Sequence, residues 1–370
     1  GHLDAILSEL KFNFPLHSPR YNAHMVSEQS LPAVLGYFAG LLYNPNNISG
    51  ESAPITLALE LEVGRMIATM LGYNPRKAWA HICSGGTLAT LEALWVARGV
   101  QFAPLIAREF CRSERLDLRV RLPNGTEAPL MEVDNRTLLG LRPQESGSVL
   151  RALAYCLETE RQLTTEAALA AVNAGVARSP FNVARRGLGP ILATTGLRPV
   201  IFASAAAHYS IVKSCNVLGY GEDAVRFIPV NDRFQMNVTA LADGLGELAA
   251  NEYVAATIGI VGTTEEGAVD PIHRIRSLRD RNEREQNRSF WIHVDAAWGG
   301  YLRTLFNGVA VRPVPHDAGI EALCDEYIAA LDLHERLDLD LGAERPDIRT
   351  LEVRWNDRET YAAFLAMAWP

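Results

Sequence analysis

The chain has 370 residues and very little lysine. Only three of its 35 basic residues are lysines, Lys11, Lys77 and Lys213, and the others are arginines. Any chemistry that needs a lysine amine therefore has three candidate side chains. The net charge is −8, and no block of Lys or Arg occurs along the chain. This charge balance argues against nucleic acid or an anionic membrane surface as the main partner.

Paired cysteines and long apolar runs are also missing. The five cysteines are odd in number and none lies in a CxxC pair: Cys83, Cys111, Cys156, Cys215 and Cys324. Such cysteines are typical of reduced thiols, so we expect a cytoplasmic protein. No apolar run reaches the roughly 18 residues that a membrane span needs, and the N-terminus has no signal-peptide pattern.

What is present is the composition of a globular chain, 48% hydrophobic and 21% charged. The length exceeds a single typical core, which predicts one large domain with appended segments. We place an N-terminal segment at residues 1–55 and the large domain at 56–301. Within that domain, residues 104–173 are polar and are expected to form an irregular insertion, with a hairpin at Asn124-Gly125. Residues 302–370 form a C-terminal segment, expected to be incomplete.

From residue 200 onward, short apolar strands alternate with helices. The strands are expected at 200–203, 225–230, 254–261 and 290–294, and the helices at 209–218, 238–250 and 272–286. This alternation predicts a parallel sheet covered by helices on both faces. Ligands of such sheets bind beyond the carboxyl ends of the strands, and four strand ends carry suggestive residues.

The first strand end runs from Cys83 through Gly85 and Gly86 into a helix that Thr87 opens. Free N–H groups and the helix dipole favour an anion such as phosphate at this place. The simpler interpretation is a tight turn with Thr87 as the N-cap residue. The dinucleotide-binding and P-loop glycine patterns are both absent.

The second and third strand ends carry a histidine and two threonines. His208 can stack on a flat ligand or transfer a proton near neutral pH, or it can be a capped structural residue. Thr263 and Thr264, followed by Asp270-Pro271, can bind a ligand or simply form the turn into the next helix.

The fourth strand end places Asp295 after a buried strand, followed by Ala296, Ala297 and two glycines. A buried carboxylate needs a partner. A protonated heterocyclic nitrogen is one such partner, and the small alanines leave room for a ring. His293 shares a strand face with Asp295, but no third metal ligand stands at a recognisable spacing, so a metal site is not favoured. Asp295 can also cap backbone donors. The GxSxG and HExxH patterns of serine hydrolases and zinc proteases do not occur.

Taken together, these strand ends resemble a known family. The matching segments are HICSGGTLATLEALW, SAAAHYSIVKSCNVLGYG, IGIVGTTEEGAVDPI and WIHVDAAWGGYLRTLF. In this order and spacing they resemble the pyridoxal-phosphate-dependent group II decarboxylases, which act on aromatic amino acids, glutamate or histidine. LGYFAGLLYNPNNIS and ETYAAFLAMAW are most similar to the bacterial tyrosine decarboxylase branch.

The resemblance implies a fold-type-I (aspartate-aminotransferase-like) large domain that binds pyridoxal 5'-phosphate. It implies a lyase that decarboxylates an L-amino acid, tyrosine first, to the amine and CO2. Glutamate decarboxylation is the alternative within the family, and transamination or carbon–sulfur cleavage is possible on the same fold. The resemblance also implies a homodimer whose other partner is a small amino acid substrate.

Six residues match family positions that contact the cofactor: Gly86, Thr87, His208, Thr263, Asp295 and Ala297. The resemblance implies that Asp295 pairs with the pyridinium nitrogen. It places His208 on one ring face, near the substrate carboxylate, and Ala297 on the other. Gly86 and Thr87 would bind the phosphate. Thr263 would place a hydroxyl near the ring. His208 and Asp295 are the expected catalytic residues.

One departure concerns lysine. The family attaches its cofactor to a lysine in a DPHK-type motif, and this sequence contains no such motif. Lys213 stands in an HYSxxK position that does not carry the cofactor in the family, and Lys11 and Lys77 match nothing catalytic. We therefore interpret the chain as the N-terminal part of such an enzyme. The alternative is a catalytically silent scaffold that lacks the attachment lysine.

Overall fold

The computed structural model describes the whole chain except residues 17, 19, 22–28 and 307–370. The described residues form two compact units. The first unit holds the described part of residues 1–84 together with 300–306, and the second is Gly85–Gly299. None of the helices described is both long and apolar enough to cross a membrane.

The first unit is helical. It contains α1 (His2–Glu9), η1 (Leu10–Phe12), α2 (Leu31–Tyr43), α3 (Pro54–Met70) and most of η4 (Gly299–Phe306). The Glu60 carboxylate on α3 accepts hydrogen bonds from Asn47 Nδ2 at 2.7 Å and from the Ile82 N–H at 3.1 Å. These bonds hold the segments on either side of α3 against the helix.

The second unit is built on a parallel sheet, as the sequence predicts. Its strands are β3 (Arg198–Ser204), β4 (Val225–Ile228), β5 (Glu252–Ile260) and β6 (Trp291–Asp295), in the order β4-β3-β5-β6. Ile258 of β5 pairs with Ala203 of β3 on one side and with His293 of β6 on the other. This register brings the carboxyl ends of β3, β5 and β6 to one edge of the sheet.

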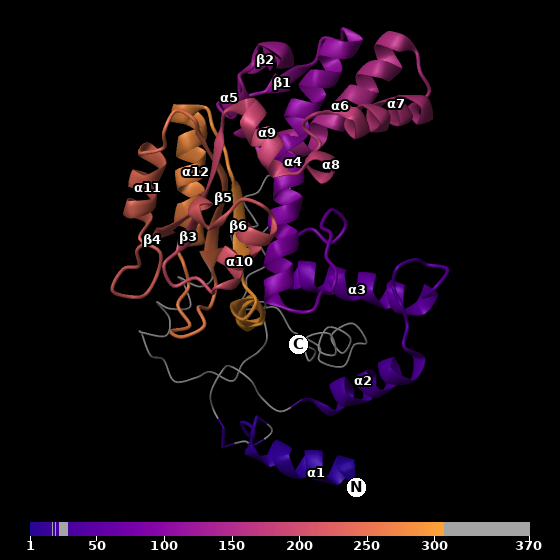
Figure 1. Cartoon of the computed structure of the whole chain (residues 1–370), viewed down its shortest axis with the longest axis vertical. Helices are drawn as coiled ribbons and strands as arrows, with labels where there is room; N and C mark the ends of the chain where they lie inside the picture. The colour runs from indigo at the N-terminus through magenta and orange to yellow at the C-terminus, as the bar shows by residue number, and fades with distance from the viewer. Residues whose placement is uncertain (17, 19, 22–28, 307–370) are drawn as a thin grey trace. The chain divides into compact units, whose positions relative to one another are not determined.

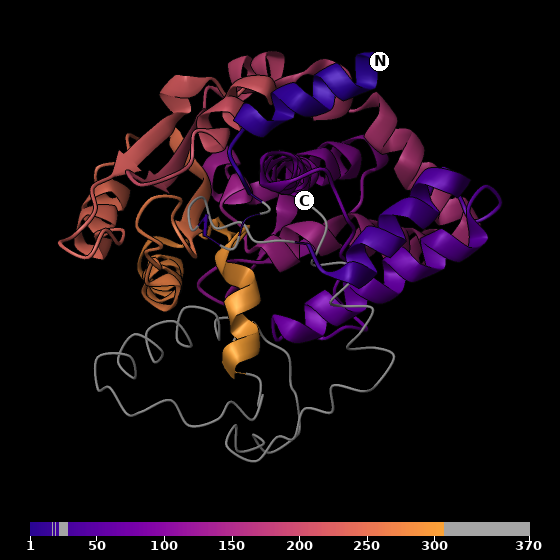
Figure 2. The same ribbon diagram turned by 90° about the horizontal axis from the view of Figure 1, so that it is seen from below.

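Helices cover both faces of this sheet. On one face lie α11 (Val238–Gly246) and α12 (Ile272–Gln286), and on the other lie α4 (Gly86–Glu114) and α10 (Ser210–Val217) (Figure 1). Figure 2 shows the same layers from below, with α4 seen nearly along its axis. Strand alternation explains the two layers. Ile201 and Ala203 join the core on the α4 side, while Val200 and Phe202 join the core on the α11–α12 side.

The region expected to be irregular, residues 104–173, is mostly helical. Its elements are the end of α4, β1 (Arg119–Arg121), β2 (Glu127–Pro129), η2 (Leu130–Glu132), α5 (Asn135–Leu139), α6 (Pro143–Arg161) and most of α7 (Thr165–Arg178). β1 and β2 pair antiparallel around Gly125, which has a φ of +90°, so the hairpin predicted at Asn124-Gly125 is confirmed. After α7 come α8 (Val183–Arg186), α9 (Leu188–Thr195) and, before β4, η3 (Glu222–Ala224).

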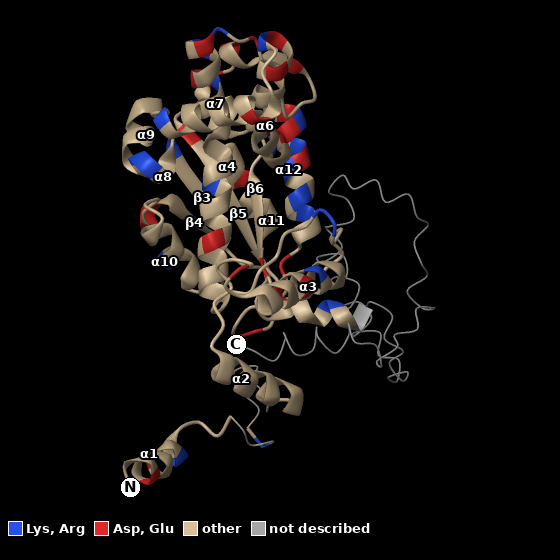
Figure 3. Cartoon of the chain, turned by 90° about the vertical axis from the view of Figure 1, so that its right-hand side faces the viewer, with Lys and Arg blue, Asp and Glu red and all other residues tan. Residues whose placement is uncertain are grey.

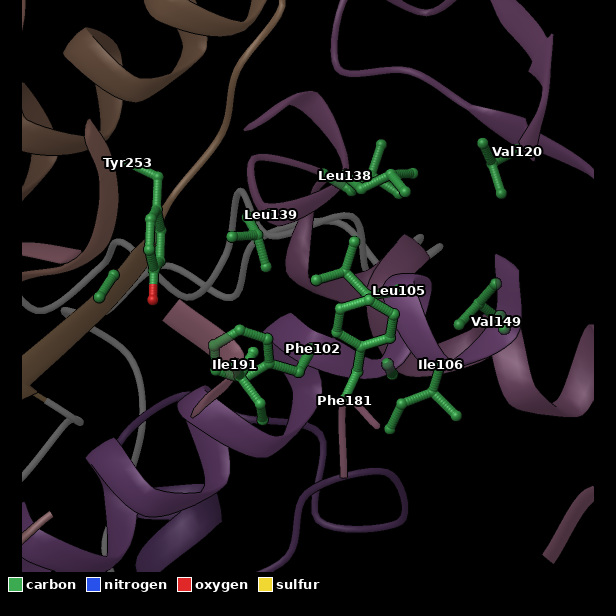
Figure 4. Packing of buried hydrophobic residues seen from close by; sticks show 14 of the residues in the cluster. Phe102, Leu105, Ile106, Val120, Leu138, Leu139, Val149, Phe181, Ile191 and Tyr253 are labelled. Carbon is green, nitrogen blue, oxygen red and sulfur yellow. The ribbon is translucent and has the colours of Figure 1, made fainter. Parts of the chain in front are cut away.

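The long helix α4 is the centre of the larger core. Figure 4 shows Phe102 and Leu105 of α4 packed among Leu138, Leu139 and Phe181. Both α4 side chains are fully buried. Burial of the neighbouring apolar residues outweighs the cost of about 3 kcal/mol that Pro104 imposes inside a helix.

The outer surface of the second unit carries the charge. Figure 3 shows acidic and basic residues on α6, α7 and α12, while the strands of the sheet are largely uncharged. The ionic contact between Arg142 and Glu283 is part-buried. The Glu283 carboxylate of α12 accepts from Arg142 Nε at 2.8 Å and from Ser289 Oγ at 2.7 Å. It joins α12 to the start of α6, so the helical insertion is fixed to the sheet layer.

Two glycine variants test the packing of the helical insertion against α4. A Cβ at Gly175 of α7 would lie 2.2 Å from Phe110 Cδ2, whereas a Cβ at Gly99 of α4 would meet open space. We expect Gly175→Ala to lower the free energy of unfolding by about 1–3 kcal/mol through overpacking. Gly99→Ala should raise it by up to about 1 kcal/mol, because alanine favours a helix. Denaturant unfolding measures both, and equal stability of the two variants would contradict this packing.

Candidate functional site

The glycine pair at the start of α4 leaves backbone donors exposed to a ligand. Gly85, with a φ of +120°, is the N-cap residue, so the predicted N-cap role of Thr87 is wrong. The strand that was expected to end at Cys83 is also not formed. The N–H groups of Leu88 and Ala89 bond back to the Gly85 carbonyl. The N–H groups of Gly86 and Thr87 bond to no residue in the described part of the chain.

The start of α4 lies directly against the segment that follows β6. A Cβ placed on Gly86 would be 3.0 Å from the Cβ of Ala297. That distance is tighter than ordinary contact, so only glycine fits at 86 without a shift of its neighbour. The structure therefore brings together two of the residues that the sequence marks, although 211 positions separate them.

Backbone hydrogen bonds join the turns after β5 and β6. The Val261 N–H donates to the Asp295 carbonyl at 2.8 Å, and the Gly299 N–H donates to the Val261 carbonyl at 3.1 Å. A Cβ on Gly262 would lie 3.1 Å from Gly299 N. Gly262 also has a φ of +88°, a backbone conformation that favours glycine. These contacts thus hold the turn after β5 beside the turn after β6 at the edge of the sheet.

Thr263 follows this close contact and is buried. Its Oγ1 accepts from the Ala268 N–H at 2.9 Å and lies 3.1 Å from Glu266 Oε2. The hydroxyl is therefore part of the turn itself, which is the simpler of the two interpretations that the sequence left open for this residue.

Asp270 has a structural role that the Asp-Pro pattern alone did not show. Its fully buried carboxylate accepts from the Met236 N–H at 2.6 Å and from the Ile260 N–H at 2.8 Å. Burial raises the pKa of Asp270 to about 6, although the two backbone hydrogen bonds act in the opposite direction. Asp270 thus ties the end of β5 to the segment before α11.

Asp295 ends β6 on the face of the sheet that α4 covers. It is half-buried, and its Oδ1 accepts from the Ala297 N–H at 3.3 Å. His293, two residues earlier, points to the same face. Burial lowers the pKa of His293, and the nearby Asp295 charge opposes this shift. Within the described ranges no group of three His, Cys, Asp or Glu side chains is placed to hold a metal ion.

His208 follows β3 at the same edge of the sheet. Its Nδ1 accepts from the Ser210 N–H at 3.3 Å, which assigns the imidazole proton to Nε2. Its ring centroid lies 4.1 Å from that of Tyr209, tilted by 41°. β5 separates β3 from β6, so the ends of these two strands are about 10 Å apart.

Lys213 is the lysine of the second unit. It is exposed on α10, with its Nζ 5.3 Å from the centre of the Tyr209 ring. Lys11 and Lys77 are exposed residues of the first unit.

The edge of the sheet thus presents free amides, a half-buried acid, an imidazole and small residues. The model of the pyridoxal-dependent decarboxylase conserved domain matches residues 162–322. Residues 162–322 belong to the pyridoxal-dependent decarboxylase family. The matched range includes His208, Thr263, Asp295 and Ala297, and pyridoxal 5'-phosphate is the cofactor that this family implies. Gly86 and Thr87 lie before it.

Two curated relatives show how far the likeness extends. An L-tyrosine decarboxylase of Levilactobacillus brevis is 32% identical over 314 residues, which are 83% of this chain and 43% of the relative. An L-2,4-diaminobutyrate decarboxylase of Acinetobacter baumannii is 34% identical over 125 residues, 34% of this chain and 23% of the relative. The chain spans less than half the length of these pyridoxal-dependent decarboxylases.

A solved structure confirms the expected fold class. The glutamate decarboxylase domain of a Vibrio parahaemolyticus protein superimposes with a TM-score of 0.50 at 18% identity, covering 81% of this chain and 49% of that one. The parallel sheet and its covering helices are therefore those of the fold-type-I pyridoxal-dependent decarboxylases.

The substitution Asp270→Asn tests the two hydrogen bonds by which the Asp270 carboxylate joins β5 to the segment before α11. An asparagine offers one acceptor oxygen to two backbone N–H groups, so we expect a loss of about 1–3 kcal/mol in the free energy of unfolding. The pKa of Asp270 rises on folding, from 3.8 to about 6. Its stabilising effect is therefore full below 3.8 and is lost as the pH rises through about 6.

Chemical unfolding from about pH 4 to about pH 7 measures this effect. The stability difference between wild type and Asp270→Asn should shrink as the pH rises, and Asp243→Asn on the exposed side of α11 serves as the control. A difference that does not change with pH would contradict the raised pKa of Asp270.

Proposed function

We propose that this chain supplies the cofactor-binding domain of a pyridoxal-phosphate-dependent carboxy-lyase that acts on an L-amino acid. One observation carries the proposal: Gly86, which opens α4 with a free amide, lies against Ala297, two residues after Asp295. An anion site and an acid at one edge of the sheet suit the two charged ends of pyridoxal phosphate, its phosphate and its ring nitrogen.

The residues at this edge fit the cofactor. The N–H groups of Gly86 and Thr87, at the positive end of the α4 dipole, would bind the phosphate. Ala297, in tight contact with Gly86, would lie against one face of the ring. His208, which follows β3, would cover the other face. Thr263 remains a candidate through its position, although its hydroxyl already has partners in the turn.

Two side chains would act on charged atoms during decarboxylation, one at the ring nitrogen and one at the substrate carboxylate. Pyridoxal phosphate, when bound, supplies an electron sink for the loss of CO2 from Cα. The Asp295 carboxylate would hold a proton at the ring nitrogen, where a negative charge favours the protonated form. The Nε2–H of His208 would donate toward the substrate carboxylate, because Nδ1 is already an acceptor for Ser210.

We further propose L-tyrosine as the first substrate. The support is the identity of 32% and 31% to the L-tyrosine decarboxylases of Levilactobacillus brevis and Enterococcus faecium, over 83% and 88% of this chain. Relatives that match a shorter part of the chain carry names with other substrates, among them diaminobutyrate. Glutamate remains the alternative that the sequence motifs raise.

A second candidate function is a silent scaffold that binds the cofactor without covalent attachment. The position of Lys213 favours it, since the amine is exposed and lies over the Tyr209 ring. In that case the domain would serve binding or assembly alone.

Substitution of Asp295 tests the cofactor site. We expect the purified chain to bind pyridoxal phosphate reversibly, and Asp295→Asn to weaken binding by about tenfold to about a hundredfold, because a charged hydrogen bond is lost. Asp243→Asn on α11 should bind like wild type. Equilibrium dialysis with absorbance detection gives the three affinities, and equal affinity of wild type and Asp295→Asn would refute the role of Asp295.

Product analysis separates the candidate activities. Release of CO2 from carboxyl-labelled L-tyrosine, faster than from L-glutamate, supports the tyrosine decarboxylase. The reverse order supports glutamate. Saturable cofactor binding with no CO2 from either amino acid, and with nothing trapped on a lysine by borohydride, supports the scaffold.

We also propose that the protein forms a homodimer. The apolar residues Leu31, Leu35, Phe38 and Leu42 form one stripe along α2, and each is more than half exposed. An exposed stripe of this kind indicates a binding surface for another chain. Sedimentation at twice the mass of the chain would support the dimer, and sedimentation at the mass of one chain would contradict it.

A further inference from the structure

A histidine beneath Asp295 has no assigned role in the site described above. His293 is on β6, two residues before Asp295 and on the same side of the sheet. Its Nε2 is buried and has no hydrogen-bond partner among the residues that the structure describes. A buried polar atom without a partner is uncommon in a folded protein and calls for a reason.

The surroundings of His293 limit the possible explanations for this unpaired nitrogen. The imidazole lies between the sheet and α4. On the neighbouring strand β5, His293 pairs with the apolar residue Ile258. The charge that acts on it is that of Asp295, which works against the lowering of the His293 pKa by burial. His293 is therefore neutral near pH 7 and carries one N–H and one lone pair.

We propose that His293 is a positioning residue for Asp295, whose imidazole N–H turns to the carboxylate when that carboxylate holds a cationic ring nitrogen. The proposal rests on the function proposed above. A carboxylate only accepts hydrogen bonds, so it selects the histidine tautomer whose N–H faces it. Among the described residues, the only donor to the Asp295 carboxylate is the Ala297 N–H, at the long distance of 3.3 Å.

The neutral state of His293 is central to this role. A neutral donor fixes the orientation of the carboxylate and leaves its negative charge available to the cofactor. An imidazolium at the same place would pair with Asp295 and compete with the ring nitrogen. A neutral, buried His293 thus leaves the carboxylate of Asp295 available to the cofactor.

The first experiment needs no cofactor. Nitrogen-15 NMR of the chain labelled at histidine, with the His293 signal assigned by its loss in His293→Gln, reports the tautomer of the ring. We expect a single tautomer in wild type, and a shift of the His293 signals in Asp295→Asn while those of His273 on α12 stay unchanged. Identical His293 signals in wild type and Asp295→Asn would overturn the proposal.

The second experiment measures pyridoxal phosphate affinity. His293→Leu should weaken binding by about tenfold, since a hydrogen bond to a charged group is lost. His293→Asn or His293→Gln keeps an N–H donor, and one of the two should restore most of the affinity. His273→Leu is the control and should bind like wild type.

The outcomes separate two kinds of failure. If wild type binds no cofactor while the NMR coupling of His293 to Asp295 is present, the proposed function fails and the contact between the two residues stands. If wild type binds cofactor and His293→Leu binds it equally well, the positioning role is wrong. If neither donor variant improves on His293→Leu, His293 acts by packing, and the proposal is also overturned.

Discussion

The hydrogen bonds between the turn after β5 and the segment after β6 determine the geometry of the site. The Val261 N–H reaches the Asp295 carbonyl, and the Gly299 N–H returns to the Val261 carbonyl. This exchange extends the pairing of β5 and β6 past the end of both strands. It fixes the height of Asp295 and of Ala297, and hence the distance between Ala297 and the start of α4. A shift by one residue would turn the carboxylate to the opposite face of the sheet.

Two buried groups maintain this arrangement, and neither contacts the expected position of the cofactor. Asp270 ties the end of β5 to the segment before α11 through two backbone N–H groups. His293 lies beneath Asp295 on the α4 side of the sheet. Both carry an energetic cost, since burial disfavours the charged form of each. Costly buried groups at a strand edge are typical of functional sites, where the fold sacrifices stability to fix a geometry.

The sequence predicted the second half of this unit well because the pattern there is local. Short apolar strands are separated by helices with polar faces, so the strands after residue 198 and the helix Ile272–Gln286 appear where the spacing predicts them. Four of the six candidate site residues, those from His208 onward, follow from the same pattern together with the family motifs. Their roles toward a cofactor stay predictions.

Other features depend on contacts that no local pattern contains. The irregular insertion was expected to begin at residue 104, yet α4 continues through Pro104 to Glu114 because the residues around Pro104 are buried. The helices of residues 143–178 contain many polar residues that dilute their apolar face, so they were expected to be irregular. Thr87 has the chemistry of an N-cap, but Gly85, two residues earlier and with a positive φ, takes that position. The partner of Asp270 is Met236, 34 residues away, and only tertiary structure shows it.

A crystal structure of the chain with pyridoxal phosphate tests the central claim most directly. We predict the phosphate on the amides of Gly86 and Thr87, the ring between His208 and Ala297, and the ring nitrogen facing the Asp295 carboxylate. A cofactor bound elsewhere, or a phosphate away from the start of α4, would contradict the assignment of this sheet edge as the cofactor site.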